Sequence, residues 1–116
     1  MSDFSINREE RNGVALVRVN GFLDAHTFEQ LEEAIREIYD GGCYKLVVDL
    51  AKVDYISSAG AGVFIGARSE SQENGGDVVL LNPTEGVKEV FELLGLTQIF
   101  KVSEDEAAAV SNFAGG

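Results

Sequence analysis

Two segments near the start of the chain have the alternating apolar and polar pattern of β-strands. The first contains Phe4 and Ile6, and the second runs over 14–19 with one face that is apolar throughout. Asn12-Gly13 between them is a strong signal for a hairpin turn, because both residue types tolerate a positive φ. The pattern therefore predicts a β-hairpin whose second strand ends at Asn20-Gly21.

A helical period follows the hairpin. The segment 27–30 has the pattern of a capping box, in which Thr27 and the side chain three residues later satisfy free backbone N–H groups. Apolar residues then recur every three or four positions, charged residues occupy the other side, and Gly41-Gly42 is a typical stop. We expect an amphipathic helix whose apolar face consists of Phe28, Leu31, Ile35 and Ile38.

Further strands follow this helix. The runs 45–50 and 78–81 are apolar on both faces, as in strands that are covered on both sides, and 99–102 predicts a short strand. Between the first two runs, a helix is expected from about Ser58 to Asn74, with Gly75-Gly76 as its stop.

Two more helices are expected near the end of the chain. Pro83 favours a helix start, and Gly95 favours its end. Ser103 and Glu106 form a second capping-box pattern that opens a last helix. The tail 114–116 should fray.

Strands that alternate with helices predict an α/β fold. We expect a single domain over 1–116, with a mixed β-sheet of about four to five strands flanked by helices. The residues expected in its core are Phe28, Leu31, Ile35, Val47, Val63, Val79, Val90 and Phe91.

Charge and composition exclude several classes of function. The formal net charge is −11, so phosphate backbones would be repelled and nucleic-acid binding is not expected. The first eleven residues lack the apolar core of a signal peptide, and no apolar run is long enough to span a membrane, so we expect a cytoplasmic protein without membrane contact. A single cysteine and a single histidine exclude an intrachain disulfide and the usual zinc ligand set, and no metal site is expected.

The segment 54–68 is unusual because a predicted helix contains Gly60, Gly62 and Gly66. Each glycine costs roughly 0.5–1 kcal/mol relative to alanine inside a helix. Close packing against the sheet would offset that cost, and so would close approach of a partner at the first turn, where Gly60 lies. The sequence leaves both explanations open.

Ser57 and Ser58 lie where the strand passes into this helix. A serine oxygen there can cap free backbone N–H groups. A phosphate on a serine would also be tolerated, because the positive end of the helix dipole accommodates an anion. Enzymatic chemistry has little support, since no G-x-S-x-G elbow is present and 60–62 is not followed by the lysine of a nucleotide-binding loop. No catalytic residue and no cofactor is expected.

Three segments resemble the STAS domain of bacterial anti-sigma-factor antagonists. The segment 21–27 is similar to the family's stretch of a glycine, hydrophobic residues and an aspartate before its first helix. The runs 46–50 and 53–56 resemble its central strand and the loop after it. The most specific is Ser57-Ser58-Ala59-Gly60-Ala61-Gly62-Val63, which resembles the family's phosphorylation segment.

The resemblance implies that Ser58 is the phosphate acceptor, with Ser57 as the alternative one residue earlier. Ser57 stands where many members have aspartate, and Ala61 stands where leucine is common. The residues that the resemblance implies in partner binding are Asp24, Thr27, Ser57, Ser58, Ala59, Gly60 and Ala61. Asp24 is equally well explained as a cap of the first helix.

The resemblance also implies a mechanism. The unphosphorylated protein would bind an anti-sigma factor with serine kinase activity and so free a sigma factor. The kinase would then phosphorylate Ser58 and dissociate, and a serine phosphatase would restore the hydroxyl. The alternative is a STAS accessory or scaffold subunit that is never phosphorylated, in a stress-signalling or transport complex.

Overall fold

The chain folds into a mixed β-sheet flanked by helices, which confirms the predicted α/β class. The computed structural model describes residues 4–114. In these residues the strand order is β1-β2-β3-β4-β5, with β1 antiparallel to β2 and the other neighbours parallel. The elements are β1 (Ser5–Arg11), β2 (Val14–Leu23), α1 (Phe28–Asp40), β3 (Lys45–Ile56), α2 (Ser58–Glu73), β4 (Asp77–Leu81), α3 (Glu85–Leu93), β5 (Lys101–Ser103) and α4 (Glu106–Ala114).

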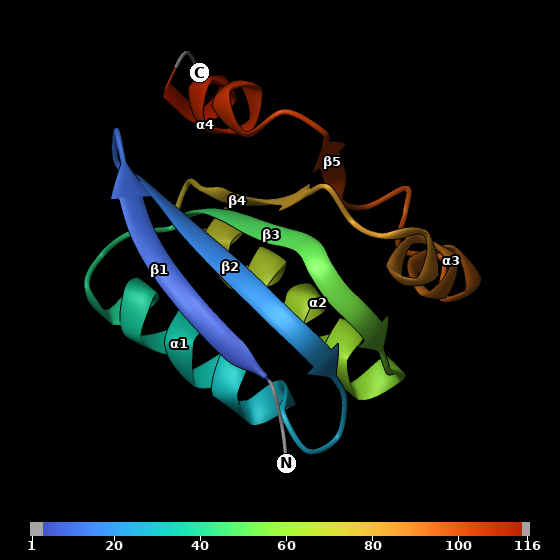
Figure 1. Cartoon of the computed structure of the whole chain (residues 1–116). Coiled ribbons are helices and arrows are strands. Elements are labelled where there is room, and N and C mark those ends of the chain that lie inside the picture. Colours follow the sequence, from blue (N-terminus) through green and yellow to red (C-terminus); the bar gives the residue numbers. More distant parts are fainter. Residues whose placement is uncertain (1–3, 115–116) are drawn as a thin grey trace.

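The helices divide the buried residues into two cores. Helices α1 and α2 pack on one face of the sheet, and α4 covers part of the other face (Figure 1). The larger core contains Leu31, Ile35, Val63 and Phe91, all predicted as core residues. The smaller core lies under α4 and includes the predicted core residues Val47 and Val79.

Two of the predicted core residues are less buried than expected. Phe28 and Val90 pack against the larger core but remain only half-buried. Phe28 is the first residue of α1, and Val90 lies one position before the buried Phe91 of α3. A side chain at the end or margin of an apolar helix stripe is covered on one side only.

The hairpin turn is confirmed, but β2 and β3 both run further than predicted, and β3 extends to Ile56. Asn12 and Gly13 have φ values of 54° and 78°, as a hairpin turn of this kind requires. Strand β2 does not end at Asn20-Gly21 but continues to Leu23. Gly21 accommodates a φ of 102°, and register shifts on either side of it let β2 stay paired with β3.

The last two helices begin at different caps from those predicted. Helix α3 begins after Pro83, at Glu85, because the Thr84 side chain accepts a hydrogen bond from the Val87 N–H (3.4 Å). Ahead of α4, the carboxylate of Asp105 accepts from the Ala107 N–H (3.0 Å). The Ser103 and Glu106 capping box is therefore absent.

The ends of the predicted elements shift in the same region. The short strand expected over 99–102 is β5, which runs over 101–103. Ala114 closes α4, and the remainder of the predicted frayed tail lies outside the described residues.

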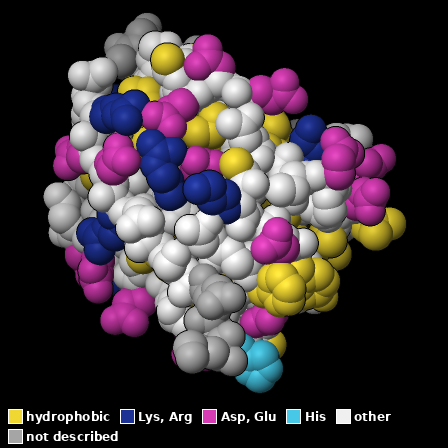
Figure 2. Space-filling view, in the orientation of Figure 1, with side chains coloured by type: hydrophobic (Ala, Val, Ile, Leu, Met, Phe, Trp, Pro, Cys, Tyr) yellow, Lys and Arg dark blue, Asp and Glu magenta, His cyan; other side chains and the backbone are white. Residues whose placement is uncertain are grey.

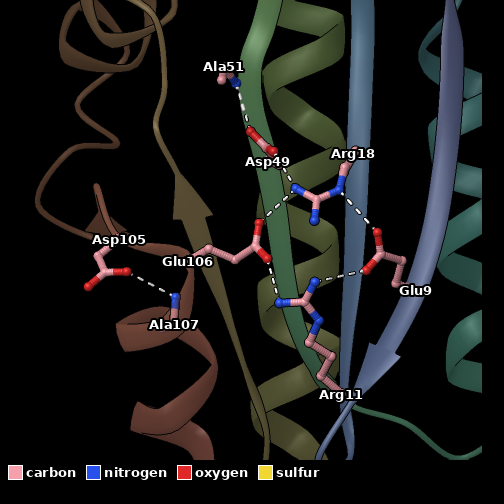
Figure 3. A network of polar contacts seen from close by, with 8 residues as sticks. All are labelled: Glu9, Arg11, Arg18, Asp49, Ala51, Asp105, Glu106 and Ala107. Atoms are coloured by element: carbon pink, nitrogen blue, oxygen red, sulfur yellow. Dashed lines mark hydrogen bonds and ion pairs between the residues drawn. The ribbon is translucent and has the colours of Figure 1, made fainter.

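An ion-pair network joins α4 to three strands (Figure 3). Arg18 Nη1 on β2 donates to Asp49 Oδ2 on β3 (2.9 Å) and to Glu106 Oε1 at the start of α4 (2.8 Å). Arg11 on β1 donates to the second oxygen of Glu106 (2.6 Å), and Glu9 lies 3.3 Å from both arginines. The hydrogen bond from Arg18 lowers the pKa of Glu106, and the reciprocal bond raises the pKa of Arg18.

Replacement of Glu106 tests whether this network stabilises the packing of α4 against the sheet. Because the pKa of Glu106 is depressed in the folded protein, its contribution to stability is present above the ordinary glutamate pKa and is lost as pH falls through the lowered value. We expect Glu106→Gln to lower the free energy of unfolding by about 1 kcal/mol at pH 7, and the deficit to be smaller at an acidic pH, where Glu106 begins to be protonated.

Urea unfolding at both pH values measures the difference. Glu104→Gln is the matched control. The Glu104 side chain is 81% exposed, and its carboxylate comes no closer than 3.9 Å to the Lys88 ammonium group. A deficit that is unchanged at low pH would show that the effect is not electrostatic.

Candidate partner-binding surface at the start of helix α2

The first turn of α2 packs tightly against the end of β2. The Ser57 N–H donates to the Leu23 carbonyl oxygen (2.9 Å). A Cβ built at Gly60 would lie 2.6 Å from that same oxygen and 2.9 Å from Leu23 Cγ. Only glycine permits this approach, so packing against the sheet accounts for Gly60.

The other two glycines of α2 have a different environment. A Cβ at Gly62 or Gly66 would meet no atom within 4 Å apart from its chain neighbours and the nearby backbone of α2 itself. Both residues line an open groove of about 520 Å³ between α1 and α2. The groove has an apolar floor and a mainly acidic rim, formed together by Glu29, Glu32, Glu33, Ile35, Arg36, Tyr39, Val63, Ala67 and Glu70.

The two serines at the junction take different roles. Ser57 is the N-cap, with extended φ and ψ of −95° and 172°, and its Oγ accepts from the Gly60 N–H (3.2 Å). Ser57 thus caps the first turn of the helix. Ser58 is the first residue of α2 and is exposed. No hydrogen bond found among residues 4–114 uses its hydroxyl.

Helix α2 has no acidic residue of its own at its positive amino terminus. Helices α1, α3 and α4 each have a glutamate in the first turn, whereas α2 has no acidic residue there. The aligned peptide dipoles leave partial positive charge on the first N–H groups. An anion next to Ser58 would therefore be stabilised by the helix.

The turn between β2 and α1 is organised by Thr27. Its side chain is 5% exposed, donates to the Phe22 carbonyl (2.7 Å) and accepts from the Asp24 N–H (2.9 Å). Because it faces back toward β2, the predicted capping box at Thr27 is wrong. The Asp24 carboxylate accepts from the His26 N–H (2.8 Å), so it also caps the turn rather than the helix.

The sheet places Asp24 and Ser58 at the same edge. Leu23 pairs with Ile56 in the parallel register of β2 and β3, so Asp24 and Ser57 both follow directly from paired residues. Gly60 and Ala61 lie on the buried side of α2, with Ala61 0% exposed, and Ser58 and Ala59 are exposed. Partner contact by these residues stays a prediction.

An exposed aromatic pair next to this edge is absent from the sequence-based predictions. Phe22 and Tyr55 are 56% and 50% exposed, and their ring centroids lie 6.1 Å apart in an edge-to-face arrangement. The 53–56 run gave no sign of it, because strict alternation would direct Tyr55 inward along with Val53.

Residues 4–114 contain neither a candidate metal site nor a membrane-spanning helix. In that part of the chain no three potential ligands among histidine, cysteine, aspartate and glutamate gather as a metal site would need. None of the helices there is long and apolar enough to cross a membrane. Cys43 is a free thiol.

Comparison with known proteins gives consistent matches. Residues 5–109 match the STAS domain family model. The chain is 32% identical to BtrV of Bordetella bronchiseptica, described as a candidate anti-sigma factor antagonist, over 93% of each chain. It is also 32% identical to an anti-sigma-B factor antagonist of Staphylococcus epidermidis, over 76% of this chain and 82% of the relative.

Solved structures share the fold. The unphosphorylated form of the anti-sigma factor antagonist SpoIIAA superposes with a TM-score of 0.84 at 24% identity, over 97% of this chain and 98% of that one. The phosphorylated form of SpoIIAA, a Bacillus cell fate determinant, gives 0.74 at the same identity, over 93% and 98%.

A pair of alanine substitutions tests the packing of α2. We expect Gly60→Ala to lower the free energy of unfolding by about 1–3 kcal/mol, because the new Cβ overlaps the Leu23 carbonyl. Gly62→Ala is the control on the same helix, and it should raise stability by roughly 0.5–1 kcal/mol, since its Cβ enters open space. Urea unfolding measures both. Equal effects of the two substitutions would contradict the close contact.

Proposed function

Because this chain belongs to the STAS domain family of anti-sigma-factor antagonists, we propose that it binds an anti-sigma factor with serine kinase activity and is released when Ser58 is phosphorylated. Antagonists of this family are regulators rather than enzymes. On this proposal the protein works in the cytoplasm, where its binding to the anti-sigma factor frees a sigma factor. A serine phosphatase returns it to the binding form.

The proposal rests on the difference between the two serines: Ser57 caps the helix, and Ser58 is exposed. The Ser57 hydroxyl oxygen is held by the Gly60 N–H at the half-buried junction. Ser58 is exposed on the first turn of α2, where a kinase active site can reach its hydroxyl. Of the two candidate acceptors, Ser58 is the one that can react without uncapping the helix.

The chemical step needs only a nucleophile from this chain. The Ser58 oxygen attacks the γ-phosphorus of ATP, a new O–P bond forms, and the bond from that phosphorus to the β–γ bridging oxygen breaks. ADP leaves, and the hydroxyl proton passes to a base of the kinase. Positioning and metal ions belong to the kinase.

Phosphorylation should leave the fold intact. Helix α2 has sixteen residues and no acidic group in its first turn, so its dipole stabilises the added charge. SpoIIAA, which shares the fold, is known in both unphosphorylated and phosphorylated forms. These two points support a switch that acts at the surface.

The same modification should weaken the complex. A kinase holds the acceptor hydroxyl against the nucleotide phosphates, so the phosphorylated serine would face the remaining phosphates of ADP. Juxtaposed like charges and an unpaired desolvated anion each oppose association. The change is local, and it does not depend on the net charge of −11.

The other residues implied in binding divide into two groups. Ser58, Ala59 and the half-buried Asp24 offer surface for direct contact with the anti-sigma factor. Thr27, Ser57, Gly60 and Ala61 are buried or half-buried, and they shape that surface. Substitution of the first group should change affinity, whereas substitution of the second should first change stability.

Mapping the phosphate tests the proposed acceptor. The purified chain is incubated with its cognate anti-sigma factor and ATP, and the modified residue is located by tandem mass spectrometry. We expect one phosphate on Ser58 and none on Ser58→Ala, which should bind constitutively. Ser57→Ala is the matched control, which should lose about 1 kcal/mol of stability with its cap and still accept phosphate.

Two outcomes would change the account. Phosphate on Ser57 would move the acceptor by one residue. Binding without phosphorylation of either serine, unaffected by Ser58→Asp, would favour the accessory or scaffold subunit instead.

A further inference from the structure

We propose that the aromatic pair Phe22 and Tyr55 is the apolar anchor of the interface with the anti-sigma factor, an inference that rests on the proposed function. The pair lies on neighbouring strands and is paired directly in the β2–β3 register. Figure 2 shows a hydrophobic patch over the carboxyl ends of these strands.

Backbone geometry places the pair on the open face of the sheet. Gly21 pairs with Val53 and Phe22 with Tyr55, so β3 contains one extra residue, Asp54, at this point. A bulge of this kind reverses the alternation that follows it. In consequence Val53 and Ile56 are both buried and Tyr55 turns outward beside Phe22.

Helix α3 touches β3 beside the pair, where the Thr84 hydroxyl donates to the Val53 carbonyl oxygen (3.0 Å), but it leaves Phe22 and Tyr55 about half exposed. Strand β4 pairs with β3 only as far as Asp49, and the smaller core under α4 lies near the opposite end, around Val14 and Val47. Large aromatic side chains that remain half-exposed and adjacent, with polar surroundings, are typical of protein interaction sites.

Distance ties the patch to Ser58. Tyr55 and Ser58 are three positions apart in the chain, so their Cα atoms lie at most about 11 Å apart. A standard interface covers about 800 Å² on each partner, which corresponds to a disc of roughly 16 Å radius. A protein that holds the Ser58 hydroxyl in its active site can therefore reach the aromatic pair with the same contact surface.

The rim of the patch indicates the chemistry of the occupant. Asp54, the extra residue of the bulge, is exposed, and its carbonyl oxygen would lie 3.9 Å from a Cβ on Gly86 at the start of α3. Glu85, the residue before Gly86 and the first of α3, is 87% exposed, and its loose ion pair with Lys88 (3.8 Å) leaves it open to a partner. These carboxylates favour an anti-sigma factor surface with an apolar pocket bordered by basic groups.

Calorimetric titration of the purified cognate anti-sigma factor tests the inference. We expect Phe22→Ala and Tyr55→Ala each to weaken binding at least about tenfold, as expected for aromatic residues near the centre of an interface. Tyr55→Phe should retain the affinity, because it keeps the ring. Circular dichroism of each variant should match wild type and thermal unfolding should change only slightly, since both side chains are about half exposed.

Val102→Ala is the matched control, since this residue is also half-exposed and apolar. Val102 pairs with Leu80, and Leu80 pairs with Val48, seven residues before Tyr55. Two strand spacings and seven residues place it about 25 Å from Tyr55, outside the expected contact area. The affinity of Val102→Ala for the anti-sigma factor should equal that of wild type.

The outcomes separate the two proposals. If wild type binds and both alanine variants bind equally well, the anchor is refuted and the proposed function stands. If wild type does not bind the anti-sigma factor, both proposals fail. If sedimentation shows a dimer of the isolated chain that Phe22→Ala abolishes, the patch is occupied by a second copy, which overturns the assignment.

Discussion

The contact between the Leu23 carbonyl and the first turn of α2 is the constraint on which the site depends. That oxygen accepts the Ser57 N–H, and the missing side chain of Gly60 lets the helix come close enough for the bond. The same residue ends β2 immediately before the Asp24 turn. One backbone group therefore joins the end of a strand, the turn after it and the start of the helix that carries Ser58.

The surface that results combines a rigid base with an exposed reactive group. The hydroxyl groups of Thr27 and Ser57 form hydrogen bonds with the backbone, and these bonds hold the turn and the helix start in place. Ser58, the residue after Ser57, stays exposed. A switch that adds charge to such a surface can change partner affinity while the two cores on either side of the sheet remain packed.

Much of the fold follows from hydrophobic periodicity, and the details of the site do not. Apolar spacing locates the helices and the buried strands, because burial of one face imposes a period of 3.6 or 2 on the sequence. The bulge at Asp54 breaks that period, so the outward direction of Tyr55 could not be read from the pattern. Thr27 likewise has a capping-box pattern, but tertiary contact with Phe22 directs its side chain elsewhere.

The most direct test of the switch compares the affinity of one anti-sigma factor for two forms of this chain. The unphosphorylated protein and the protein phosphorylated at Ser58 are titrated separately by calorimetry, after circular dichroism has shown that both are folded. The account predicts binding at least about tenfold weaker for the phosphorylated form, because apposed like charges cost several kcal/mol. Equal affinities for two folded forms would contradict it.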